Sequence, residues 1–248
     1  CKPFHAGKAA QNGLLAARLA ARGFSSRPEL VECEQGFALT HGPGFHPEAA
    51  LADPPGGFHI LANLFKYHAA CYLTHGPIEA ACQVRQVHAI EPERVASIAL
   101  KLDRGCDRVC NIPAPRDGLE SKFSLRQTVA MALAGIDTAR LDAYGEATAR
   151  DPALIALRER VTIDFQNGWP QTVAEIEVAL TDGRRVGASH DSGVPAADIA
   201  EQGRRLAAKF DALVAPVLGA ARARELRETI AGLDDIADIG VLTRLAAN

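Results

Sequence analysis

Apolar residues recur at helical spacing near both ends of the chain. Alanine and leucine return every three to four positions over residues 8–22 and again over residues 197–231. This period is typical of amphipathic helices. The first helix should end at Gly23, because glycine readily adopts the left-handed conformation that closes many helices. One more short helix is predicted over residues 233–245.

The middle of the chain mixes helical spacing with strict alternation of apolar and polar positions. Alternation predicts half-buried strands. The expected helices span residues 72–87, 123–134 and 153–158, and the expected strands span residues 94–102, 160–165, 174–180 and 184–189. Asp182-Gly183 favours a tight turn, so the last two strands should be adjacent. The pattern therefore predicts an α+β protein with a small sheet between two helical ends.

Glycine and proline interrupt the pattern between residues 36 and 58. The segments Gly42-Pro43-Gly44 and Pro54-Pro55-Gly56-Gly57 favour loops around one short helix over residues 47–52. We expect this part of the chain to lie at a surface or at the mouth of a site.

Composition excludes several classes of protein. The chain is 48% hydrophobic and 23% charged with a formal net charge of -3, as in ordinary globular proteins. Its 27 basic residues are interspersed with 30 acidic ones and form no basic stripe, so no nucleic-acid partner is expected. Apolar stretches fall short of the ~20 residues that cross a bilayer. We therefore expect no membrane partner and a cytoplasmic location.

The six cysteines indicate neither a disulfide framework nor a metal site. They are few and irregularly spaced for a chain of 248 residues, which favours reduced thiols. Cys106 and Cys110 lie four positions apart, but no second pair follows at the spacing of a zinc site. We predict no metal.

Two segments place cationic and titratable side chains at helix beginnings. Lys2 and His5 precede the first helix, where an ammonium group and free backbone N–H groups can hold a carboxylate together. A solvated lysine is the alternative there. In the second segment Lys66 is followed by Cys71 and His75. His75 and His5 could each act as an acid or a base, or each could serve only as a structural hydrogen-bonding residue.

The two segments, Cys1 to Gly13 and Lys66 to Ala81, resemble the MmgE/PrpD family, which includes 2-methylcitrate dehydratase and cis-aconitate decarboxylase. Two further segments, Glu120 to Leu125 and Thr181-Asp182-Gly183 followed by Lys209-Phe210, occur in the family's order. The resemblance covers essentially the whole chain and corresponds to the C-terminal part of a family member. We therefore expect that an N-terminal helical part is missing and that this chain alone is inactive.

The resemblance implies a fold in which a small α/β lid domain is inserted into a largely helical domain. Residues 1–64 and 191–248 would belong to the helical domain, and residues 65–190 would form the lid. Family members are generally homodimers when complete. They act on small di- and tricarboxylates without a metal or an organic cofactor.

The resemblance also implies roles for individual residues. Lys2 and Lys66 would bind substrate carboxylates, with His5 as a weaker candidate, and His75 would move a proton. Cys71 and Lys66 would be catalytic residues together with His75, although Cys71 stands where animal decarboxylases have histidine. Gln127 stands where many members have tyrosine.

These roles imply a carbon–oxygen lyase that hydrates or dehydrates a 2-methylcitrate-like acid, with decarboxylation and epimerisation as alternatives. An alternative from another class is a non-catalytic binding module that needs a separate N-terminal half.

Overall fold

The computed structural model describes residues 2–42 and 44–247, apart from the side chains of residues 2 and 3. The chain divides into two compact units, residues Cys1–His59 and Ile60–Asn248. We describe each unit by itself.

The first unit contains one long helix and two short ones. α1 spans Lys2–Ala20, so it begins six residues before the start that the spacing predicts. Gly23 follows the helix with a φ of 85°, the left-handed conformation expected of it. The predicted short helix is present as α3 (Pro47–Leu51), whereas α2 (Phe37–His41) was not predicted. Five residues between chain breakers carry too little periodicity to reveal α2.

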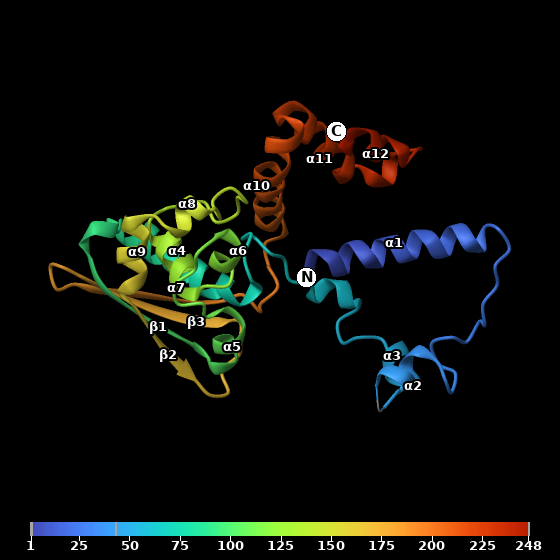
Figure 1. Ribbon diagram of the computed structural model, residues 1–248, viewed down its shortest axis with the longest axis horizontal. Helices are drawn as coiled ribbons and strands as arrows, with labels where there is room; N and C mark the ends of the chain where they lie inside the picture. Colours follow the sequence, from blue (N-terminus) through green and yellow to red (C-terminus); the bar gives the residue numbers. More distant parts are fainter. Residues whose placement is uncertain (1, 43, 248) are drawn as a thin grey trace. The chain divides into compact units, whose positions relative to one another are not determined.

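The second unit is built on a four-stranded sheet with the order β2-β1-β3-β4 (Figure 1). The strands are β1 (Val95–Asp103), β2 (Val161–Gln166), β3 (Val173–Leu180) and β4 (Arg185–Asp191). β1 pairs in parallel with β2 and antiparallel with β3, and β4 pairs antiparallel with β3. All four predicted strands are thus present.

Helices cover one face of this sheet. α4 (His75–His88), α7 (Leu125–Leu133) and α9 (Pro152–Glu159) are the main ones, and α4 contacts α7, β3 and β4. Short helices α5 (Asp107–Cys110), α6 (Gly118–Ser121) and α8 (Glu146–Ala149) join them, with single 3-10 turns at His59–Ala62, Tyr72–Thr74, Pro92–Arg94 and Arg104–Cys106. The other sheet face leaves Lys101, Glu175 and Glu177 exposed.

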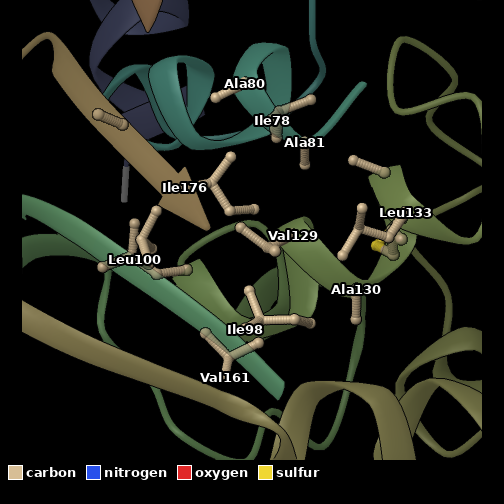
Figure 2. Packing of buried hydrophobic residues seen from close by; sticks show 14 of the residues in the cluster. Ile78, Ala80, Ala81, Ile98, Leu100, Val129, Ala130, Leu133, Val161 and Ile176 are labelled. Atoms are coloured by element: carbon tan, nitrogen blue, oxygen red, sulfur yellow. The ribbon is translucent and has the colours of Figure 1, made fainter. Parts of the chain in front are cut away.

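The core lies between the sheet and the helices. Alternation along β1 turns Ile98 and Leu100 toward the helices, where they meet Val129 of α7 (Figure 2). Ile78 of α4 and Ile176 of β3 belong to the same cluster. Burying side chains of this size contributes about 1.5–3 kcal/mol each, so this cluster fixes how α4 lies on the sheet.

Helix ends in this unit follow from local chemistry. Ser124 caps α7 by accepting the backbone N–H of Gln127 at 3.2 Å, and Asp151 caps α9 through the N–H groups of Ala153 and Leu154. α4 ends at His88, and Ala89, which caps it, is left-handed with a φ of 48°. The Asp182-Gly183 turn joins β3 to β4, as predicted.

The C-terminal stretch forms three α-helices. Gly219, with a φ of 81°, divides the helical spacing of residues 197–231 into α10 (Ile199–Leu218) and α11 (Ala220–Ala231). A 3-10 turn at Leu233–Asp235 precedes α12 (Gly240–Ala246). Within the ranges that the structure describes, no helix is long and apolar enough to cross a membrane. The predicted α+β class is confirmed, while the lid and its helical partner stay predictions.

Candidate functional site

His75 stands at the first position of α4 and lines a pocket of about 180 Å³. Its side chain is buried, with the residue only 2% exposed. Tyr72 and His68 pack against the imidazole, each with a ring-centroid separation of 4.9 Å. The Nε2 atom of His75 is buried and has no hydrogen-bond partner among the described residues. An orphaned polar atom of this kind is unfavourable unless a ligand satisfies it.

The surroundings of His75 favour a neutral imidazole. Burial, followed by the charges of His68, Lys66 and Lys209, lowers its pKa to about 3 against the opposing effect of Glu79. At neutral pH this side chain is therefore uncharged. A neutral imidazole can accept a proton or a hydrogen bond at one ring nitrogen.

Next to His75, a network of polar contacts holds His68 in place. Its Nε2 lies 3.1 Å from Oε1 of Glu79, and its Nδ1 lies 2.7 Å from Oγ1 of Thr138. The guanidinium of Arg205 donates to the same Glu79 oxygen. Burial by itself would raise the pKa of Glu79, but the hydrogen bonds and charges of His68 and Arg205 lower it to about 2. Glu79 is thus a permanent carboxylate that balances two neighbouring groups.

Positive charge accumulates beside this network. The Lys66 ammonium donates to the Ala70 carbonyl at 3.3 Å, and the Lys209 ammonium donates to the carbonyl of Lys66. Burial, followed by the charge of Lys66, lowers the pKa of Lys209. Arg205 lies 3.7 Å above the Tyr67 ring in a cation–π contact. Of the three cations Lys66, Lys209 and Arg205, only Arg205 is paired with Glu79. The two lysines would therefore attract an anion.

The far wall of the pocket comes from the end of β4 and the segment that follows it. Tyr72 donates its hydroxyl to the Ser192 carbonyl at 2.5 Å. Burial, followed by the charge of Asp191, raises the pKa of Tyr72, which therefore remains a phenol. Hydrogen bonds from Thr172 and the Gly193 N–H lower the pKa of Asp191. This wall therefore supplies a fixed carboxylate and a phenolic proton.

The structure brings some of the predicted residues together. The charge of Lys66 acts on His75, although Lys66 is itself exposed and does not line the pocket. Cys71 is buried in the hydrophobic cluster and does not line the pocket wall, and its backbone N–H donates to the Lys122 carbonyl at 3.0 Å. His5 is exposed on α1, in the first unit. The Lys2 side chain lies outside the described residues.

Sequence reasoning did not single out His68, Glu79, Tyr72 or Arg205. Two local signals were available, since Glu79 lies four positions after His75 on one helix and His68 follows Lys66 closely. Arg205 had none, because it is 126 positions away from the carboxylate it contacts.

Gln127 makes buried structural contacts. Its Oε1 accepts a hydrogen bond from Nη1 of Arg158 at 2.9 Å, and its Nε2 donates to the Thr148 carbonyl at 3.2 Å. No group of three His, Cys, Asp or Glu side chains suited to a metal ion occurs in the described ranges.

Comparison with known proteins gives two findings. The model of the MmgE/PrpD C-terminal domain matches residues 68–235, which include α4, the sheet, α10 and most of the pocket wall. A cis-aconitate decarboxylase of Aspergillus terreus is 24% identical over 264 residues, covering 96% of this chain and 53% of that protein. The chain thus spans about half the length of this curated relative.

Proposed function

Because the chain belongs to the MmgE/PrpD family, we propose that it is the carboxylate-binding C-terminal part of a lyase that acts on a small di- or tricarboxylate. The reaction that we propose first is hydration or dehydration of a 2-methylcitrate-like acid. The complete protein would be a cytoplasmic homodimer that needs no metal or organic cofactor. Residues 65–190 would form a lid on a helical domain made by residues 1–64 and 191–248.

One observation carries this proposal: His75, whose Nε2 is buried and has no hydrogen-bond partner among the described residues, lines a pocket that also contains Arg205, and the charges of Lys66 and Lys209 reach its imidazole. The charges of Lys66 and Lys209 both lower the pKa of His75, so both lysines lie close enough to act on the imidazole. A substrate carboxylate bound between these lysines would supply the missing negative charge. Lys2 would hold a second carboxylate, with His5 as a weaker candidate.

Carboxylate binding would also prepare His75 for proton transfer. An anion close to the imidazole favours its charged form and raises its pKa from about 3 toward the neutral range. The imidazole could then take a proton from the carbon beside the carboxylate, while the lysines stabilise the negative charge that develops there. Tyr72 could protonate the departing hydroxyl group, so that water leaves. Each proton is accounted for by a group on the pocket wall.

Decarboxylation is the second candidate, and epimerisation the third. The similarity to a cis-aconitate decarboxylase favours decarboxylation over epimerisation. In that reaction carbon dioxide leaves, and an acid returns a proton to the carbon. Cys71 stands where animal decarboxylases have histidine, and in this structure it is buried in the core cluster. We therefore propose that His75 returns the proton to the carbon, and we keep Cys71 as a secondary candidate for this step.

The proposal is tested with the complete protein that contains this chain. Turnover and solvent-deuterium incorporation are measured with 2-methylcitrate, citrate and cis-aconitate, in the unchanged protein and in Lys66→Ala and His75→Gln variants. We expect His75→Gln to lose proton exchange by a factor of roughly 100 or more, as is typical for a general base. Lys66→Ala should mainly raise KM.

Lys101→Ala is the matched control, since Lys101 is exposed on the open face of the sheet, away from the pocket. Its activity should equal that of the unchanged protein. If the complete protein neither turns over nor exchanges protons with any of these acids, the proposal is overturned and a binding module becomes the better hypothesis. Formation of itaconate-type products with loss of carbon dioxide would establish the second candidate instead.

A further inference from the structure

A second pocket lies on the other side of the Tyr67–Arg205 stack. Its volume is about 350 Å³. Tyr67 and Arg205 line both pockets, and His68 lines only the second. Arg85, Lys209 and Asp137 supply further charged groups to its wall. His75 does not line it. The second pocket is therefore distinct from the one assigned to the substrate.

Arg85 is the unusual member of this wall. Its Nε is buried and has no hydrogen-bond partner, and no carboxylate within the described residues forms an ion pair with it. A Cβ atom added to Gly135 would come within 3.3 Å of Nη1 of Arg85, and Gly135 has a φ of 77°. The backbone thus passes close to the guanidinium without offering it an acceptor. A buried charged donor in this state is unfavourable until an acceptor arrives.

The charges of the wall leave a positive excess. Glu79 engages Arg205, so Arg205 is compensated within the protein. Arg85 and Lys209 remain, and Asp137 is the carboxylate on the same wall. Oδ1 of Asp137 accepts a hydrogen bond from the Ala139 N–H at 2.9 Å, a local contact that does not involve Arg85. With Arg205 paired to Glu79, the wall of the second pocket holds two further cations, Arg85 and Lys209, and one carboxylate, Asp137, which leaves an excess of positive charge.

We propose that the second pocket binds a small doubly charged oxyanion, such as phosphate or a dicarboxylate, through Arg85 and Lys209. A guanidinium presents two parallel donors that match two oxygens of such a group, and the ammonium adds a point charge. Lys209 also belongs to the proposed substrate site, whereas Arg85 lines only the second pocket, so Arg85 is the residue that tests this proposal separately from the lyase activity. An anion here would also act on the first pocket, since Lys209 influences His75.

The first measurement follows the side-chain N–H signal of Arg85 by NMR during titration with inorganic phosphate or succinate at constant ionic strength. The signal is assigned by its loss in Arg85→Gln. A saturable shift in the millimolar range or below is expected. An unmoved signal with both anions overturns the proposal.

The second measurement uses Cys82, which lines the second pocket and not the first. Alkylation of Cys82 is followed by mass spectrometry with and without phosphate, and half-buried Cys33 of the first unit is the internal reference. Phosphate should slow the labelling of Cys82 at least threefold and leave Cys33 unchanged. The labelling rates with and without phosphate are compared within each variant, because burial raises the pKa of the Cys82 thiol and the charge of Arg85 itself acts to lower it.

Two variants decide where the anion binds. Arg85→Gln should abolish the protection of Cys82, and Lys209→Gln should weaken it. Arg108→Gln, at an exposed position away from the pocket, removes the same charge and should leave protection intact. Equal protection in the unchanged protein and in Arg85→Gln would place the anion elsewhere and overturn the proposal. His75→Gln should retain protection, which separates this site from the substrate pocket.

Discussion

His68 and His75 meet edge to face, with ring centroids 4.9 Å apart and planes inclined at 67°. Both come from the segment that leads into α4, yet their hydrogen bonding differs. Both ring nitrogens of His68 are engaged, by Glu79 and Thr138, whereas Nε2 of His75, a residue that lines a pocket, is buried without a partner among the described residues. One imidazole is therefore fixed by the protein, and the other is available to a ligand.

The stability of the protein should depend on pH through His75. Its folded pKa of about 3 lies below the usual 6.5, so the unfolded chain binds more protons between these values and stability falls as pH decreases through that window. On acidification the unchanged protein should lose on the order of 4 kcal/mol more unfolding free energy than the His75→Gln variant. Urea unfolding from neutral pH down to about pH 4 measures it. Parallel pH profiles of the two proteins would contradict the assignment.

Replacing Glu79 should destabilise the protein at neutral pH. In Glu79→Gln, His68 and Arg205 lose their shared carboxylate, and we expect a loss of about 2–4 kcal/mol in the free energy of unfolding. The folded pKa of Glu79, about 2, lies below the usual 4.5. Its stabilisation is therefore present above pH 4.5 and is lost as pH falls toward 2, so the two proteins should converge in acid.

The matched control for Glu79 is Glu177→Gln. Glu177 pairs with Arg185 on the exposed face of the sheet, where ion pairs contribute little. A loss below about 1 kcal/mol is expected for this control. Equal losses in the two variants would show that burial of the Glu79 network has no energetic importance.

The contact between Gln127 and Arg158 should be needed for stability. Gln127→Leu removes the acceptor of a buried guanidinium, which then keeps only the Ala149 carbonyl. We expect a loss of about 1–3 kcal/mol, measured by chemical denaturation. Gln127→Glu restores an acceptor and should recover much of the loss. If both variants are as stable as the unchanged protein, water satisfies Arg158 instead.

Two glycines should respond in opposite directions to replacement by alanine. A Cβ at Gly118 would lie 1.8 Å from the Tyr144 carbonyl oxygen, so Gly118→Ala must displace backbone and should lose about 2 kcal/mol or more. Gly203 is within α10, and a Cβ there meets nothing within 4 Å. Gly203→Ala should therefore raise the free energy of unfolding by about 0.5–1 kcal/mol and raise the melting temperature with it. Differential scanning calorimetry of both variants checks this contrast.

The elements of the second unit could largely be predicted from the sequence because their periodicity is strong. β1 and β3 alternate cleanly, and α4 and α7 repeat at helical spacing. The sheet order could not be predicted, because the parallel pairing of β1 with β2 depends on where α7 and α9 cross between them. Short helices such as α5 and α8 lack a full period and left no signal.

The candidate site could be predicted only in part, for a similar reason. Lys66 and His75 belong to one continuous segment and therefore drew attention together. Arg205 and Lys209 reach that segment from α10, which no local pattern indicates. Whether His75 Nε2 would be satisfied also depended on the tertiary structure. Sequence identified the segment, and packing determined which of its side chains remain open.

The helix that supplies Arg205 and Lys209 contributes no buried residue of its own. Its attachment to the rest of the unit thus relies on polar contacts rather than on the core, and such segments open locally at a small fraction of the global unfolding energy. Backbone amides of α10 should exchange with deuterium well before those of α4 and α7. Each opening would carry Arg205 away from both cavities and Lys209 away from the second, so ligand capture and release would be tied to the local opening of one peripheral helix.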